Sequence, residues 1–274
     1  MYAFDYQRPE SLKAAANLLA KSEEAKLLAG GQTLIPTMKL RLASPASLID
    51  LSGIRELKGI EVTPRLVSIG AMTTHAEVAS AQAVREAIPA LAELAGLIGD
   101  PAVRHMGTIG GSVANNDPAA DYPAACLGLA ATIHTTKRKI PADEFFTGMF
   151  ETALEPDEIV TRVSFPVPRR AGYAKFRNPA SRYALVGVFV AKRAGEVRVA
   201  VTGAGPSVFR VPEMEEALGR RFAAKSLEAV TVSPDGLNSD IHASAPYRAH
   251  LVGVMARRAV EAATTRPEKA EAEH

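Results

Sequence analysis

The chain has 274 residues, which exceeds a typical single domain, so we expect two or three packed units with a sizeable core. Its 32 Lys and Arg nearly balance 30 Asp and Glu, and a net charge of +2 argues against nucleic acid or an anionic membrane as the partner. No apolar run is long enough to span a membrane, and the amino terminus lacks a signal-peptide pattern. We therefore expect a cytoplasmic protein, peripheral to a membrane only through partners, that binds a small molecule or another protein.

Cysteine and histidine usage limits the chemistry further. Cys126, the one cysteine, lies in an apolar run and cannot form an internal disulfide or hold an iron-sulfur cluster, so an inert core position is expected. The six histidines show no metal-ligand spacing, and no metal site is predicted.

The first 57 residues read as a small α/β unit. A helix to about Ser22 precedes a short strand at 26–29, a glycine-bearing turn, a helix from Leu34 to Leu42 and a strand at 47–51. The turn Ala29-Gly30-Gly31-Gln32-Thr33 directly follows the strand, so its N–H groups are expected to face a ligand.

A second unit is expected at 58–170. A strand at 66–70 is followed by the capping-box pattern of Thr74 and by one helix that ends near Gly99. The stretch 106–123 (MGTIGGSVANNDPAADYP) has no apolar period, so neither a helix nor a long strand is expected in it.

The rest of this unit combines short elements. They are a helix at 124–128, strands at 131–136 and 158–165, and a basic turn, Lys137-Arg138-Lys139, that reads as solvated surface. A boundary is predicted at 167–171, where two prolines follow the last strand.

The last third, 171–265, reads as an α+β domain. Two long β-rich runs separated by Arg193-Ala194-Gly195 predict antiparallel pairing. Helices are expected at 212–218, 226–230 and 245–263, and the charged tail 266–274 is expected to be disordered.

The two glycine-bearing stretches together predict a ligand with a central diphosphate, because neither turn alone offers enough N–H donors. Neither matches a P-loop or a Rossmann fingerprint. Asp121 has two open readings: its carboxylate accepts a hydrogen bond from a ribose or ribityl hydroxyl, or it caps the helix that follows.

Three segments resemble the FAD-binding medium subunit of molybdenum hydroxylases, the carbon monoxide dehydrogenase and xanthine dehydrogenase family. They are LAGGQTLIPTMKLRLASPASLIDL (28–51), MGTIGGSVANNDPAADYP (106–123) and YAKFRNPASRYALVGVFVA (173–191). The resemblance implies an α+β protein: a two-part FAD-binding unit of the vanillyl-alcohol-oxidase type, 1–57 and 58–170, then a C-terminal α+β domain, 171–265.

By this resemblance, main-chain N–H groups of two turns hold the FAD diphosphate, Asp121 binds FAD hydroxyls, and Ile98 with Ile159 or Val160 packs near the isoalloxazine ring. Lys175 and Tyr183 match positions close to that ring and are the candidates for tuning or gating its open edge. The two turns comprise Leu28, Ala29, Gly30, Gly31, Gln32, Thr33 and Leu34, and Thr108, Ile109, Gly110, Gly111 and Ser112.

The sequence departs from the family pattern at Ser112, where many relatives have Asn, and at Gln32-Thr33, where many have His-Ser or Gln-Ser. Both changes keep a side chain able to form hydrogen bonds, so FAD binding is still expected. Neither turn contains His or Cys, so the flavin is expected to be non-covalent.

The implied function is electron transfer in a heteromeric oxidoreductase. A large molybdenum-cofactor subunit oxidises the substrate, a small subunit with [2Fe-2S] clusters passes electrons on, and this chain delivers them through FAD to an external acceptor, in a dimer of heterotrimers. Two alternatives remain: a stand-alone FAD oxidoreductase of the same fold, and a non-redox assembly module.

Overall fold

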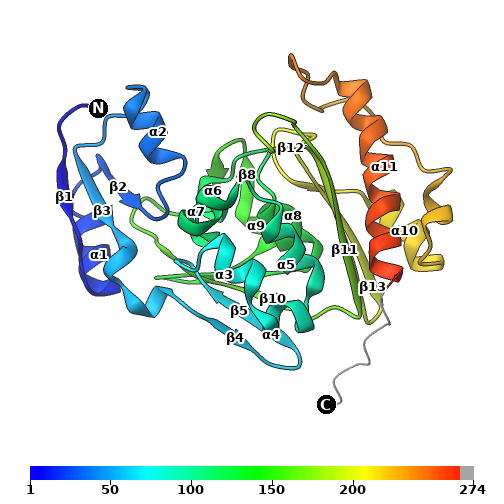
Figure 1. Cartoon of the computed structure of the whole chain (residues 1–274), viewed down its shortest axis with the longest axis horizontal. Helices are drawn as coiled ribbons and strands as arrows, with labels where there is room; N and C mark the ends of the chain where they lie inside the picture. Colours follow the sequence, from blue (N-terminus) through cyan, green and yellow to red (C-terminus); the bar gives the residue numbers. More distant parts are fainter. Residues whose placement is uncertain (266–274) are drawn as a thin grey trace.

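The computed structural model describes residues 1–265, in which three larger β-sheets follow one another along the chain, beside one two-stranded sheet (Figure 1). The tail predicted at 266–274 lies outside the described residues. The amino-terminal sheet is parallel, in the order β1-β3-β2. Its strands are β1 (Asp5–Gln7), β2 (Ala25–Leu28) and β3 (Ser47–Asp50), connected by α1 (Leu12–Leu19) and α2 (Leu34–Lys39) and followed by the 3₁₀ turns η1 (Leu51–Gly53) and η2 (Arg55–Leu57).

This small unit places the first glycine turn at an exposed end of the sheet. Ser11 caps α1 by accepting a hydrogen bond from the N–H of Ala14, and the apolar face of α1 packs on the sheet through Ala15 and Leu19. The turn at 29–33 then lies between the carboxyl end of β2 and the start of α2, as the sequence predicts.

The middle sheet is antiparallel, in the order β4-β5-β10-β6-β7, and its helices gather on one face (Figure 1). The strands are β4 (Ile60–Val62), β5 (Leu66–Gly70), β6 (Thr132–Thr135), β7 (Lys139–Pro141) and β10 (Val160–Pro166), beside the hairpin β8 (Phe146–Gly148) and β9 (Glu151–Thr152). The helices are α3 (His75–Ser80), α4 (Gln82–Ala87), α5 (Pro89–Gly96), α6 (Pro101–Met106), α7 (Ile109–Asn115), α8 (Tyr122–Gly128) and α9 (Ala142–Phe145).

Two predictions for this unit were wrong. The single helix expected up to Gly99 is divided into α3, α4 and α5, because Ala81 is extended and Pro89 begins a new helix. The stretch 106–123, expected to lack a helix, contains α7, which starts at a Thr108 cap and ends at Asn116 in the left-handed conformation.

The carboxy-terminal sheet is antiparallel, in the order β11-β12-β13-β14, which confirms the predicted pairing across Arg193-Ala194-Gly195. Its strands are β11 (Arg170–Arg177), β12 (Ala184–Arg193), β13 (Glu196–Thr202) and β14 (Phe209–Arg210). Helices α10 (Pro212–Arg220) and α11 (Ala245–Thr264) cover its outer face, and a 3₁₀ turn, η3 (Ala224–Leu227), stands where a helix at 226–230 was expected.

This last sheet is buried on both faces, which explains the unbroken apolar run of β12. Val186, Val188 and Val190 face α10 and α11, whereas Phe189 and Ala191 join the core of the middle unit. The two cores therefore share the sheet as a common wall, and they hold the middle and carboxy-terminal units together.

The basic turn at 137–139 is exposed at the surface, as expected, and two of its side chains form ion pairs there. Lys137 bridges Glu155 and Asp157 at 2.7 and 2.6 Å, and Arg138 pairs with the buried carboxylate of Glu158. These ion pairs connect the turn to residues 155–158, which directly precede β10. Cys126 is buried as expected, and burial raises the pKa of its thiol.

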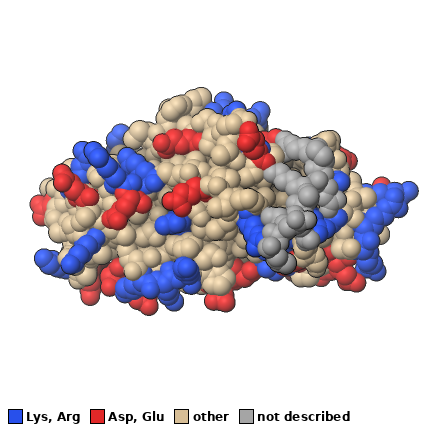
Figure 2. Space-filling model, turned by 90° about the horizontal axis from the view of Figure 1, so that it is seen from below, with Lys and Arg blue, Asp and Glu red and all other residues tan. Residues whose placement is uncertain are grey.

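On the face shown in Figure 2, acidic and basic side chains are interspersed, without a large area of one sign. Within residues 1–265, no helix combines the length and apolar character needed to cross a bilayer.

Candidate functional site

A cavity of about 730 Å³ opens where the three units meet. Its walls come from the first glycine turn, from α7, from the segment leading into β10 and from the β11–β12 region. The volume falls in the range of small-molecule and cofactor sites, roughly 300–1,000 Å³. Almost all of the predicted site residues line it; Leu28 and Ile109, which belong to β2 and to the buried side of α7, do not.

The first glycine turn offers main-chain donors to this cavity. Gly31 has a φ of +69°, a conformation that glycine adopts without strain, and Gln32 donates its side-chain N–H to the carbonyl of Gly30. In the described chain, the N–H groups of residues 31–34 have no hydrogen-bond acceptor. Successive unpaired N–H groups of this kind form a concave anion site suited to phosphate.

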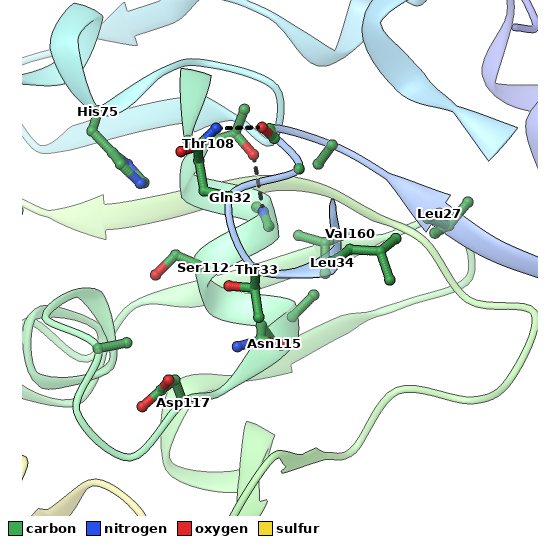
Figure 3. Close-up of a pocket in the computed structure, with 18 of the residues that line it drawn as sticks. Leu27, Gln32, Thr33, Leu34, His75, Thr108, Ser112, Asn115, Asp117 and Val160 are labelled. Atoms are coloured by element: carbon green, nitrogen blue, oxygen red, sulfur yellow. Dashed lines mark hydrogen bonds between the residues drawn. The ribbon is translucent and has the colours of Figure 1, made fainter. Parts of the chain in front are cut away.

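The second turn is built differently from the expectation. Its main-chain donors are used inside the protein: Ile109 N–H donates to Thr73, Gly110 N–H to Ala71, and Gly111 N–H to the hydroxyl of Thr108, which caps α7. The polar groups that α7 presents to the cavity are instead the hydroxyl of Ser112 and the amide of Asn115 (Figure 3). On the α7 side of the cavity, a ligand would therefore meet polar side chains and not free main-chain N–H groups.

The glycines of both turns serve close packing of backbone on backbone. A Cβ on Gly30 would lie 2.2 Å from the carbonyl oxygen of Met106, and one on Gly110 would lie 2.5 Å from the Cβ of Ala71. Only glycine allows these approaches. The two turns therefore touch each other, which fixes the width of the cavity between β2 and α7.

Asp121 is held by two residues of β11. Its carboxylate is 4% exposed and accepts the hydroxyl of Tyr173 at 2.5 Å and the ammonium of Lys175 at 2.9 Å. Burial raises the pKa of Asp121, while Lys175 and Tyr173 act in the opposite direction. The side chain makes no cap to α8, so the capping alternative was wrong.

Lys175 is a buried cation, although its residue type alone suggested a surface charge. Its side chain is 2% exposed, and the ammonium also donates to the carbonyl of Leu97 at 3.3 Å. Both Lys175 and Asp121 line the cavity, so a buried ion pair forms part of its wall beside β11.

Among the other ionisable groups that line the cavity, His75 and Glu158 have strongly shifted pKa values. His75 is buried, and loss of hydration with the nearby Arg104 charge lowers its pKa to about 4, so the ring is neutral at neutral pH. Glu158 is buried too, but hydrogen bonds from Arg138, Thr135 and the Glu155 N–H outweigh its burial and lower its pKa to about 2. One side chain is thus held neutral and the other charged.

The apolar part of the wall comes from Ile98, Ile159 and Val160, and the half-exposed ring of Tyr183 stands at the edge. Sequence reasoning missed His75, Asn115 and Tyr173. Tyr173 had a signal in the sequence, because it precedes Lys175 by two residues on a strand and so shares its face.

The donor set fits FAD. Unpaired N–H groups at 31–34 suit a diphosphate, the Ser112 and Asn115 side chains suit hydroxyl groups, and the Ile98 region with Tyr183 suits a flat aromatic ring. The Lys175 ammonium adds a positive charge to the wall of the same cavity.

Known families cover nearly the whole chain. Residues 2–168 match the family described as FAD binding domain in molybdopterin dehydrogenase, and residues 171–263 match the CO dehydrogenase flavoprotein C-terminal domain.

Individual relatives agree with these matches. The carbon monoxide dehydrogenase medium chain of Hydrogenophaga pseudoflava is 38% identical over 219 residues, covering 74% of this chain and 76% of the relative. The nicotine 6-hydroxylase medium subunit of Paenarthrobacter nicotinovorans is 37% identical over 212 residues, covering 74% and 75%.

Solved structures confirm the α+β fold class. A chain of the reconstituted CO dehydrogenase from Oligotropha carboxidovorans superposes with a TM-score of 0.87 at 36% identity, covering 97% of this chain and 99% of that one. A chain of quinoline 2-oxidoreductase from Pseudomonas putida 86 gives 0.87 at 29% identity, covering 96% and 98%. The chain therefore belongs to the family of FAD-binding medium subunits of the molybdenum hydroxylases, and it is an oxidoreductase subunit with FAD as its cofactor.

Proposed function

We propose that this chain carries electrons within a heteromeric molybdenum hydroxylase in the cytoplasm. It accepts them from an iron-sulfur subunit and passes them to an external acceptor, while a large molybdenum-cofactor subunit oxidises the substrate; two such heterotrimers form the complex. The observation that carries the proposal is the cavity shared by all three units, which offers phosphate donors at one end and a buried ion pair at the other.

In this proposal each part of the cavity wall binds a different part of FAD. The N–H groups of 31–34 bind the diphosphate of FAD, and the side chains of Ser112 and Asn115 bind its hydroxyl groups. FAD, when bound, collects electrons and releases them one or two at a time. The Lys175 ammonium, held by Asp121, stabilises negative charge at the ring, and the Tyr183 side chain covers an edge of it.

The names of the relatives support the assembly, since several are the medium chain of a dehydrogenase or hydroxylase. A stand-alone oxidoreductase needs an acid or base free to act over the flavin. The His75 imidazole is neutral and buried, and the Asp121 and Glu158 carboxylates are tied to cations, so none of these three is free for that role.

The test is purification of the tagged chain from its native host under mild conditions. We expect bound FAD, together with iron and molybdenum in a fixed ratio from co-purifying subunits. A flavin-loaded chain that comes without such subunits and oxidises a substrate alone would support the stand-alone alternative instead. A chain without flavin would support the assembly module.

A further inference from the structure

A second cavity, of about 360 Å³, adjoins the FAD cavity between the middle unit and the carboxy-terminal sheet. Asp117, Ser181 and Tyr183 line both cavities. The wall between them is the loop that joins β11 to β12, with Tyr183 as its largest side chain. A molecule in the second cavity therefore lies directly across this loop from the cofactor.

Hydrogen bonds from Asn178 brace this loop, and the Asn178 side chain also presents an amide donor that has no partner in the described chain. The side-chain oxygen of Asn178 accepts the N–H groups of Ala180 at 2.9 Å and Ser181 at 3.1 Å, and the Asn178 N–H donates to the carbonyl of Tyr183. Asn178 is 8% exposed, and within residues 1–265 its side-chain NH₂ has no acceptor. An amide donor that has no partner among these residues and is open to the cavity is suited to a carbonyl oxygen of a ligand.

The aromatic ring of Phe150 lines the second cavity and is exposed to solvent. Phe150 has a φ of +57°, which costs energy for a non-glycine residue, and its side chain is 55% exposed. Asn116 holds this conformation, because its carbonyl accepts the Phe150 N–H and its side chain donates to Gly148 and Glu151. The cavity is thus lined by two rings, Phe150 and Tyr183, with which a flat ligand stacks.

The charged side chains of Arg248 and Asp240, which line the second cavity, form an ion pair. Arg248 is buried and donates to the carbonyls of Leu185 and Gly203 and to the carboxylate of Asp240 at 2.7 Å. Asp117 also lines this cavity, so its lining has no excess of positive charge. An anionic ligand such as a phosphate is therefore disfavoured, and an uncharged one is favoured.

We propose that this second cavity binds the oxidant of the cofactor, an uncharged, planar quinone ring, between Phe150 and Tyr183, with a ring carbonyl accepting from the Asn178 amide. The volume suits one or two fused rings and not a dinucleotide. A bound quinone would take two electrons and two protons from the two-electron-reduced, doubly protonated cofactor and leave as the hydroquinone, which returns the cofactor to its oxidised form. This inference rests on the proposed function and names the class of acceptor.

The test is equilibrium binding of menadione, a soluble quinone, to the oxidised, FAD-loaded chain by titration calorimetry, where no turnover occurs. Asn178→Asp keeps the oxygen that braces the loop but removes the donor, and Phe150→Gly removes the ring at a φ that glycine tolerates. We expect each change to weaken binding about tenfold, the loss of one hydrogen bond or one ring contact. Ile241→Ala is the matched control, because Ile241 is 95% exposed and does not line the cavity.

Unchanged menadione affinity in both Asn178→Asp and Phe150→Gly would overturn the inference, as would no binding to the parent, or displacement of menadione by NAD⁺. These results leave the proposed function standing as long as the chain retains FAD and its partner subunits. Loss of FAD or of the partners from the parent chain contradicts the proposed function itself.

Discussion

Replacing Asp121 by Asn tests how the buried ion pair supports the FAD site. The change removes the carboxylate that accepts both Lys175 and Tyr173 and leaves an ammonium that is 2% exposed without a counter-ion. Breaking a buried ion pair from one side costs about 3–5 kcal/mol of unfolding free energy. Removing both charges in Asp121→Asn with Lys175→Met leaves no buried charge, so we expect a total cost well below the sum of the two single changes.

The assay is urea-induced unfolding of the cofactor-free chain for the parent, both single variants and the double variant. We expect a coupling free energy of about 2–4 kcal/mol between the two positions, as for other buried charged pairs. Additive costs would refute the reasoning, because they would mean that Lys175 finds water or another partner when Asp121 is neutral.

The same four proteins separate two roles of Asp121 toward FAD. If the carboxylate acts only by placing Lys175 and Tyr173, then Asp121→Asn made in the Lys175→Met background changes FAD affinity by no more than about twofold. A further loss of tenfold or more, about 1.4 kcal/mol, would instead show direct contact between carboxylate and cofactor. Fluorescence titration with FAD measures this difference.

Three other changes test the walls of the cavity. Glu158→Gln should lower stability by about 2–3 kcal/mol at neutral pH, and the gap should close as pH falls from 4.5 towards 2, where the parent carboxylate gains its proton; a gap independent of pH in parallel urea titrations would contradict this. The parent should lose up to about 3 kcal/mol as pH falls from 6.5 to 4, because His75 gains a proton in the unfolded chain while its buried imidazole stays neutral in the folded one, and His75→Gln should remove that part of the slope in pH-dependent unfolding. Gly110→Ala should destabilise the cofactor-free chain by about 1–3 kcal/mol through its collision with Ala71; normal stability with lost FAD binding would point to a ligand contact.

The sequence predicted the elements whose signal is local. The capping box at Thr74 and the strands on either side of Arg193-Ala194-Gly195 depend on residues close in the chain, and the structure contains them. Helix α7 was missed because its start depends on distant partners: the N–H groups of Ile109 and Gly110 donate to Thr73 and Ala71. A cap completed by tertiary contacts has no periodic pattern to reveal it.

In the candidate site too, local sequence features were predictable and contacts between distant segments were not. The order of the glycine turns predicted which segments form the cavity, but not which groups stay free in it. Asp121 is fully engaged because β11, more than fifty residues later, brings Tyr173 and Lys175 against it. That pairing depends on how the carboxy-terminal sheet packs against α5 and α8 of the middle unit, and a single sequence does not specify such packing.

The fold fixes the protonation states of His75 and Glu158 in the walls of the cavity, and this bears on what the chain does. At neutral pH the His75 imidazole is neutral by burial, Glu158 is charged because Arg138 and Thr135 hold it, and Asp121 is paired with Lys175. A general acid or base works best with a pKa near the working pH, and neither His75 nor Glu158 has one. Fixed charges of this kind tune the electronics of a cofactor without themselves gaining or losing protons.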